Sequence, residues 1–320
     1  MNISVLGCGR WGSFLAWYST KIGHSVKLWG REGSKTLEEL KETRKNAYLE
    51  LPLSVDLTDN LEESLLFSDT IIIAISAQNL REFLKRLNTF DISNKTFILN
   101  MKGLEIGSGK RLSTVFKEEI KQENCEVAVW LGPGHVQDFY AGIPNCMIMG
   151  SYNFEITKKL VDIFKSDLIR FYYAQDMIGN EVGAATKNVI GIAAGMLDGA
   201  GLSSLKGALM ARGTHEVARL IKVMGGNQES AYGLAHLGDY EATLFSTHSN
   251  NRLYGERYVK NEAFGKLAEG VHTIKALREI EELYTIELPI SHALYEVIFN
   301  KKDFKEVMKI LFDRTIKFEF

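Results

Sequence analysis

The stretch "ISVLGCGRWGSFLAW", residues 3–17, decides the fold. It consists of a short apolar strand, three glycines in the order Gly7-x-Gly9-x-x-Gly12, and the start of a helix. In such a unit Gly7 permits a tight turn, Gly9 lets the backbone approach a pyrophosphate, and Gly12 lets the helix pack closely on the strand. The helix N-terminus then presents N–H groups and a positive dipole end to the phosphates. The stretch therefore predicts the first βα unit of a dinucleotide-binding domain.

The rest of the first half alternates short β-branched runs with amphipathic, charged segments, which is typical of βαβ units around a parallel sheet. We expect strands at residues 3–6, 25–29, 70–75, 96–100, 126–131, 146–149 and 169–173, and helices at 12–22, 79–87 and 110–121. After about Gln175 the strand pattern fades, and helices are expected at 182–196, 205–223, 268–283 and 291–299. The fold class is thus α/β: a Rossmann-type doubly wound parallel sheet over residues 1–178, followed by an all-α domain over 179–320.

The composition, with 45% hydrophobic and 24% charged residues, is that of an ordinary soluble protein. A formal net charge of -2 gives no general attraction to nucleic acid or to an anionic membrane, so local groups must hold any anionic ligand. The three cysteines have neither CxxC pairing nor metal-ligand spacing, which favours a reducing compartment. Because the sequence opens on an expected strand, we expect no signal peptide, and no apolar run has the length of a membrane span. We expect a cytoplasmic protein without membrane insertion, nucleic-acid partner or metal.

The end of the second expected strand bears on the choice of dinucleotide. An acidic residue there normally binds the ribose hydroxyls of NAD, whereas an arginine accommodates the 2′-phosphate of NADP. Here the strand ends "VKLWGRE", with Arg31 at its tip and Glu32 after it. Because a solvated loop charge is also common at such a position, the cofactor is expected to be NAD or NADP.

Two further loops follow strands at the edge of the sheet where ligands gather. "FILNMKGLE" delivers Lys102 beside a glycine, and "VAVWLGPGH" presents Gly132 and Gly134, where backbone can approach a ligand. A lysine at a strand end is equally often only a solvated charge.

The helix "VGAATKNVIGIAAGM", residues 182–196, contains a single charged residue, Lys187, in an apolar run. Gly183, Gly191 and Gly195 lie on its stripe at four-residue steps. Each glycine in a helix interior costs about 1 kcal/mol against alanine, so something is expected to pack closely there. The lysine either extends its stem over apolar surface to water or lies beside a ligand, with Gly183 and Gly191 leaving space for substrate and cofactor.

Reduction of a ketone needs a proton donor beside the carbonyl oxygen, and a lysine with a lowered pKa can serve near neutral pH. None of the seven histidines is paired with a carboxylate in the sequence pattern. His135, which follows the glycine turn, is the alternative candidate for the proton donor. In the second half, Asp239 in "AHLGDYEATL" and the polar run "STHSNNRLYG" are further candidates. The alternative interpretation of Asp239 is a turn residue, and that of the polar run is a polar loop without a functional role.

Six segments together carry a family resemblance: residues 7–12, 101–105, 132–133, 183–190, 237–239 and the pattern Ser249-x-Asn251-Arg252. Over almost its whole length the chain resembles the soluble NAD(P)-dependent glycerol-3-phosphate dehydrogenases. The resemblance implies interconversion of dihydroxyacetone phosphate, a phosphorylated three-carbon ketone, and sn-glycerol 3-phosphate for phospholipid synthesis. It also implies Lys187 as the general acid/base. Homodimers are common for this architecture, so we expect a homodimer.

The resemblance also implies two sets of binding residues. Substrate contacts would come from Lys102, Gly132, Gly134, Asp239, Ser249, Asn250 and Asn251. Cofactor contacts would come from Gly7, Gly9, Arg10, Trp11, Gly12, Arg31, Lys102, Val136, Leu267 and Glu269.

The chain departs from the family pattern at several positions. Leu131, Gly134, Val136 and Asp138 stand where serine, a hydroxyl residue, alanine and glutamate are usual, and Asn250 stands where an arginine is expected. A phosphate carries close to two negative charges at pH 7, and a guanidinium is its strongest single protein partner. Arg252 is one candidate substitute. The departure leaves two alternatives open: a paralogue that reduces an unphosphorylated hydroxy-ketone or keto acid, and a non-catalytic NAD(P)-binding sensor, which would have no need of a proton donor.

Overall fold

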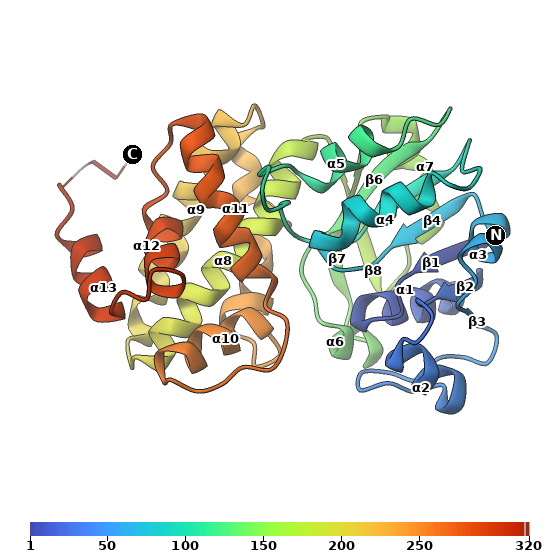
Figure 1. The fold of residues 1–320 in the computed structure, drawn as a ribbon, viewed down its shortest axis with the longest axis horizontal. Coiled ribbons are helices and arrows are strands. Elements are labelled where there is room, and N and C mark those ends of the chain that lie inside the picture. Colours follow the sequence, from blue (N-terminus) through green and yellow to red (C-terminus); the bar gives the residue numbers. More distant parts are fainter. Residues whose placement is uncertain (317, 320) are drawn as a thin grey trace.

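The computed structural model describes residues 1–316, 318 and 319. An α/β lobe and a helical lobe lie side by side (Figure 1). The α/β lobe is built on one eight-stranded sheet in the order β3-β2-β1-β4-β5-β6-β7-β8. Its strands are β1 (Asn2–Leu6), β2 (Ser25–Trp29), β3 (Asp56–Thr58), β4 (Thr70–Ile73), β5 (Thr96–Leu99), β6 (Glu126–Leu131), β7 (Asn145–Ser151) and β8 (Ile169–Ala174). All seven predicted strands are present within a few residues of their expected bounds, and β3 is an additional edge strand.

The order reverses between β1 and β4, which pair in parallel with Val5 opposite Ile72. In a doubly wound sheet this reversal opens a crevice at the carboxyl ends of the strands, where ligands bind. One pairing corrects the predicted parallel sheet: β7 runs antiparallel to β6. The connection between them contains only the five-residue helix α6 (Val136–Tyr140), which is too short to carry the chain back along the sheet as a parallel crossover requires.

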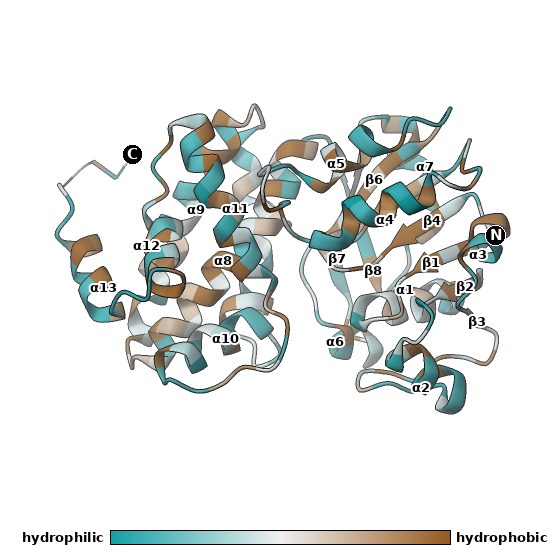
Figure 2. Cartoon of the chain, in the orientation of Figure 1, coloured by the Kyte–Doolittle hydropathy of each residue, from teal (hydrophilic) through white to brown (hydrophobic). Residues whose placement is uncertain are grey.

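Helices cover both faces of the sheet: α1 (Arg10–Lys21), α2 (Lys35–Thr43), α3 (Leu61–Phe67), α4 (Leu80–Leu87), α5 (Leu112–Glu119) and α7 (Phe154–Phe164). Strand β4 shows why two layers form, because its buried side chains alternate between faces. Ile72 packs into the apolar cluster that contains Phe14 and Trp130, whereas Ile71 and Ile73 pack into the cluster on the other face. Figure 2 shows hydrophobic residues along the central strands and mixed hydrophobic and hydrophilic surfaces on α2 and α4.

The helical lobe comprises α8 (Met177–Gly199), α9 (Lys206–Val223), α10 (Asn250–Val259), α11 (Glu269–Tyr284), α12 (Pro289–Ile298) and α13 (Phe304–Phe312). Helix α8 is its buried centre and begins where the Asp176 side chain accepts a hydrogen bond from the Gly179 N–H. The division of the chain at residue 178 stays a prediction. No helix among residues 1–316, 318 and 319 combines the length and the hydropathy needed to cross a lipid bilayer.

Glycines allow α8 and α10 to approach backbone to backbone. A Cβ on Gly195 would lie 1.9 Å from the carbonyl oxygen of Arg252, and one on Gly255 would lie 2.0 Å from that of Ile192. The close packing predicted from the glycine stripe is therefore confirmed. The suggestion that Gly183 and Gly191 make room for ligands is wrong, since these two glycines face His236 and Thr243.

Candidate active site

A cavity of about 350 Å³ lies where the carboxyl ends of the strands meet α8. Residues that follow β1, β4, β5 and β6 line one side, and residues of α8, the segment around Asp239, α10 and α11 line the other. The predicted site residues among its lining are Arg10, Trp11, Lys102, Gly134, Lys187, Asp239, Ser249, Asn250, Asn251, Leu267 and Glu269. Side chains far apart in the sequence thus share one cavity at the reversal point of the sheet.

Two lysines share one buried carboxylate in this cavity. Oδ2 of Asp239 lies 2.7 Å from Nζ of Lys102 and 2.8 Å from Nζ of Lys187. Lys102 also donates a hydrogen bond to the carbonyl oxygen of Gly132 at 2.7 Å. Two ammonium groups against one carboxylate leave one positive charge, which suits a polarised or anionic oxygen on a ligand.

The environment of Lys187 tunes its basicity. Burial is the main cause that lowers the pKa of Lys187 from 10.5 to about 8; the charge of Lys102 acts in the same direction and Asp239 opposes both. An amine with that pKa exchanges a proton readily near neutral pH, which is the property required of a general acid/base.

Thr243 is a site residue that the sequence analysis missed. Its Oγ1 accepts a hydrogen bond from Lys187 Nζ at 2.7 Å and lies 3.4 Å from Oδ1 of Asp239. It stands in a π-helical segment, Glu241–Phe245, four residues beyond Asp239. Such wide turns often occur at functional sites. The signal in the sequence was one threonine in "YEATLF", and a single threonine is too common to indicate a site.

The glycine turn after β1 fits a dinucleotide pyrophosphate. Gly7 has φ +116° and an added Cβ would lie 2.5 Å from the Ala74 carbonyl oxygen, while a Cβ on Gly12 would lie 1.7 Å from the Gly7 carbonyl oxygen. Gly9 faces open space and has no side chain to cap α1. The first N–H groups of α1 are therefore available to phosphate oxygens.

Comparison with known proteins agrees with this geometry. Family profiles described as NAD-dependent glycerol-3-phosphate dehydrogenase N-terminus and C-terminus match residues 2–157 and 176–309. The chain belongs to this family. It is 34% identical to a glycerol-3-phosphate dehydrogenase [NAD(P)+] of Pelodictyon phaeoclathratiforme, an alignment that covers 100% of this chain and 99% of that relative. The corresponding enzyme of Fusobacterium nucleatum is 35% identical, with 100% and 98% covered.

Solved structures of the family share the fold. The crystal structure of glycerol-3-phosphate dehydrogenase from Coxiella burnetii superposes with a TM-score of 0.90 at 28% sequence identity. The match covers 98% of this chain and 99% of that one. Both lobes and their relative placement are therefore features that this chain has in common with the family.

Five predicted cofactor residues and one predicted substrate residue lie outside the cavity lining: Gly7, Gly9, Gly12, Arg31, Val136 and Gly132. The glycines shape the turn described above, and Gly132 presents its carbonyl oxygen to Lys102. Arg31 is exposed just beyond β2, and Val136 is buried as the first residue of α6. Their roles toward a cofactor stay predictions.

His135, held in reserve as a proton donor, is not suited to that role. Burial, together with the positive charges of Arg10 and Lys187, lowers the pKa of His135 to about 4, so its imidazole is neutral at pH 7. Glu269 lies at another side of the cavity and accepts a hydrogen bond from Ser76 Oγ at 3.2 Å. Burial also raises the pKa of Glu269, which limits the negative charge facing a ligand.

The segment around α10 differs from the family's expected phosphate site. Ser249 caps α10 by accepting from the Arg252 N–H at 3.3 Å, and Asn251 donates to Asn188 Oδ1 at 3.0 Å. The Asn250 amide donates to the Leu267 carbonyl oxygen at 3.2 Å. Each of these groups is held at the cavity, yet none of them carries a charge.

Arg252 does not replace the missing arginine. Its Nη1 lies 2.8 Å from Asp198 Oδ2 and 3.0 Å from Glu256 Oε2, and the residue is absent from the cavity lining. A guanidinium bound by two carboxylates is already neutralised. The candidate substitute named from the sequence is therefore wrong.

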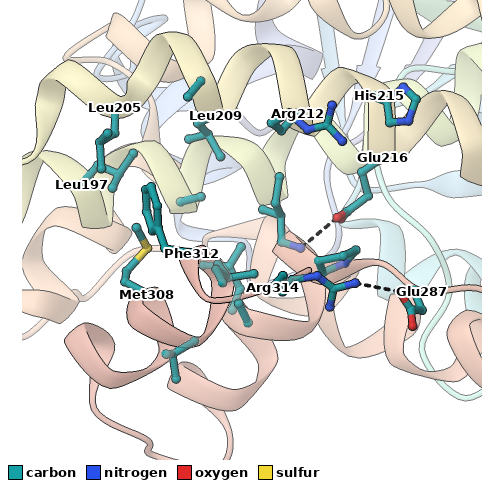
Figure 3. A pocket seen from close by; sticks show the side chains of 18 of the residues that line it. Leu197, Leu205, Leu209, Arg212, His215, Glu216, Glu287, Met308, Phe312 and Arg314 are labelled. Atoms are coloured by element: carbon teal, nitrogen blue, oxygen red, sulfur yellow. Dashed lines mark hydrogen bonds and ion pairs between the residues drawn. The ribbon is translucent and has the colours of Figure 1, made fainter. Parts of the chain in front are cut away.

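A larger groove of about 800 Å³ lies in the helical lobe. Figure 3 shows Phe312 and Met308 on the side of Leu197, with Arg314 paired to Glu287 toward the other end. Among the described residues that line it there is no lysine, and its surface is largely apolar. It lacks the shared-carboxylate chemistry of the smaller cavity, which remains the candidate active site.

Proposed function

We propose that this protein interconverts dihydroxyacetone phosphate and sn-glycerol 3-phosphate with NAD(H) or NADP(H). The observation that carries the proposal is the pairing of a buried Lys187 with Asp239 in a cavity beside the glycine turn. Family membership supports the same reaction, since the named relatives are glycerol-3-phosphate dehydrogenases that use NAD(P)+.

When bound, the nicotinamide supplies the hydride that reduces the ketone carbon, or accepts it in the reverse direction. In the reduction, the Lys187 ammonium donates a proton to the carbonyl oxygen, and in the oxidation the neutral amine removes the hydroxyl proton. Asp239 and Thr243 hold Nζ of Lys187 in place through contacts of 2.8 and 2.7 Å. Lys102, bound to the same carboxylate, adds positive charge where the carbonyl oxygen becomes more negative.

The phosphate end of the substrate lies toward α10 in this proposal. Ser249 and the amides of Asn250 and Asn251 offer hydrogen-bond donors, and the α10 N-terminus adds backbone N–H groups. The product would supply the backbone of glycerophospholipids. The three cysteines are free thiols, in keeping with a reaction in the reducing cytoplasm.

The test is a spectrophotometric assay of NADH and NADPH oxidation with dihydroxyacetone phosphate and, separately, with unphosphorylated dihydroxyacetone. The proposal expects turnover with the phosphorylated ketone and a kcat/KM at least 100-fold lower without the phosphate. A preference for the unphosphorylated ketone would instead identify a paralogous reductase. Cofactor binding without turnover of either ketone, or of a panel of 2-keto acids, would identify a sensor.

We further propose that the protein is a homodimer in which a second copy covers the groove in the helical lobe. Phe312 of α13, and Ile316 and Phe318 after it, line that groove and have largely exposed side chains. A two-fold interface buries the same patch on both copies. A face that carries both a groove and exposed apolar side chains can therefore pack against the same face of a second copy. Light scattering should give twice the chain mass, and Phe312→Glu should give the monomer. Leu53→Glu, at an exposed site in the other lobe, is the matched control.

A further inference from the structure

Arg10 is the only arginine among the described residues that line the active-site cavity. It is the first residue of α1, and the hydrogen-bond partners of its guanidinium all lie in other segments of the chain. Nη2 donates to Gln137 Oε1 at 2.8 Å and approaches His135 Nδ1 at 3.3 Å, while Nη1 donates to the His248 carbonyl oxygen at 3.4 Å. The side chain therefore connects the glycine turn with the segment that leads into α10.

The charge of this guanidinium has no direct counter-ion. Its three acceptors are an amide oxygen, a neutral imidazole and a backbone carbonyl, and no ion pair of Arg10 occurs among the described residues. Arg252 is the contrasting case, since two carboxylates neutralise it. A partly buried cation with neutral partners is costly to desolvate, and an anionic ligand removes that cost.

Two buried N–H groups also lack acceptors: one belongs to the guanidinium itself and the other to the His135 ring. Because an arginine can only donate, Nδ1 of His135 must accept from Arg10, which places the imidazole proton on Nε2. Neither His135 Nε2 nor Arg10 Nε has a hydrogen-bond partner among the described residues. Unsatisfied buried donors are uncommon and here point to a ligand rich in oxygen acceptors.

The position of the guanidinium indicates that it contacts the substrate rather than the cofactor. Its contact at His248 is two residues before Asn250, the position where a family member is expected to carry arginine. His135, whose Nδ1 lies 3.3 Å from Arg10 Nη2, lines the same cavity as Lys187. If the carbonyl oxygen of a small substrate lies at Lys187, the positive charge of Arg10 can attract a negative charge at the other end of that substrate.

We propose that Arg10 binds the phosphate of the substrate and supplies the guanidinium that Asn250 lacks, an inference that rests on the proposed function. The glycine turn keeps its backbone N–H groups for the cofactor pyrophosphate, whereas the Arg10 guanidinium lies between residues 135–137 of its own lobe and the His248 carbonyl oxygen of the helical lobe. The missing arginine on α10 is thus replaced by one from the other wall of the same cavity.

The experiment compares Arg10→Ala, Asn250→Arg and the double variant. Arg10→Ala should raise the KM for dihydroxyacetone phosphate by about 10- to 100-fold, the range expected for a hydrogen bond to a charged group. The Kd for NADH, measured by fluorescence, should change less than threefold. Adding Asn250→Arg to Arg10→Ala should recover most of the lost affinity, because the guanidinium returns from the opposite wall. Arg170→Ala, at an exposed arginine outside the cavity, is the control and should match the wild type.

Two results would overturn the inference. One is a weaker Kd for NADH with an unchanged KM for the ketone phosphate, which would assign Arg10 to the cofactor. The other is a double variant no better than Arg10→Ala. If the wild type fails to reduce dihydroxyacetone phosphate, the proposed function fails, and a titration with inorganic phosphate at saturating NADH still tests Arg10. In that titration phosphate should raise the melting temperature of the wild type but not of Arg10→Ala, and equal shifts would refute the assignment.

Discussion

The ammonium of Lys187 lies 2.8 Å from Oδ2 of Asp239, an oxygen that also contacts Lys102 at 2.7 Å. This shared carboxylate explains how a lysine can stand in the apolar helix α8. A buried ammonium without a counter-ion would lose its proton, whereas one paired too strongly would keep it at all accessible pH values. Competition between burial, Asp239 and Lys102 leaves Lys187 able to exchange its proton in the working range.

Replacement of Lys187 by alanine tests the proton-transfer role directly. Removal of a general acid typically costs about 10²- to 10⁴-fold in rate, so kcat for reduction of dihydroxyacetone phosphate should fall by that factor. Lys102 stays paired with Asp239, so the carboxylate is not left isolated and the fold should persist. Circular dichroism and NADH binding check the fold. Turnover within threefold of wild type would refute the role.

The pH dependence follows from the lowered pKa of Lys187. Reduction needs the ammonium, so kcat/KM for the ketone should fall as the pH rises through about 8. Oxidation of glycerol 3-phosphate needs the free amine, so its kcat/KM should rise through the same value. Profiles from pH 6 to 11 in both directions measure this transition. A transition near 10.5 would show that burial does not perturb Lys187.

Thr243 should position Lys187 rather than bind substrate. Thr243→Val keeps the shape but removes the hydroxyl that accepts from Nζ at 2.7 Å. That hydrogen bond favours the charged form, so its loss should move the transition in the pH profile to lower pH and lower kcat by about 10-fold. Thr243→Ser retains the hydroxyl and should restore both properties. An unchanged profile in Thr243→Val would contradict this role.

Gly195 is required by packing rather than by chemistry. An alanine Cβ would lie 1.9 Å from the Arg252 carbonyl oxygen, so α10 would have to shift. Gly195→Ala should therefore lower the free energy of unfolding by about 3 kcal/mol or more. Gly207→Ala is the matched control in α9, where a Cβ meets open space. It should stabilise the protein by up to about 1 kcal/mol through helix propensity. Urea unfolding measures both, and equal effects would rule out the close contact as the cause.

Local patterns were sufficient for much of the fold. The glycine turn predicted the β1–α1 unit, and hydrophobic periodicity predicted α8 and the apolar strands. They did not predict the reversed direction of β7, because parallel and antiparallel strands in a buried sheet have the same apolar pattern. The short helix α6, with five residues, offered too little periodicity to reveal how the chain turns there.

The candidate site shows the same division. By itself the sequence determined that a glycine turn, a helix with one lysine and an uncharged Ser249-Asn250-Asn251 segment exist, because these depend on residue types close together in the chain. Only the tertiary structure decided that Asp239 pairs with both Lys102 and Lys187, and that Thr243 accepts a hydrogen bond from Lys187. It also decided that Arg252 pairs with two carboxylates, whereas Arg10 lines the cavity. Lys102 and Asp239 are separated by 137 residues, and Lys187 and Thr243 by 56. Charge and hydrogen-bond partners act through space over a few ångströms, so a pattern along the chain cannot reveal which of them meet.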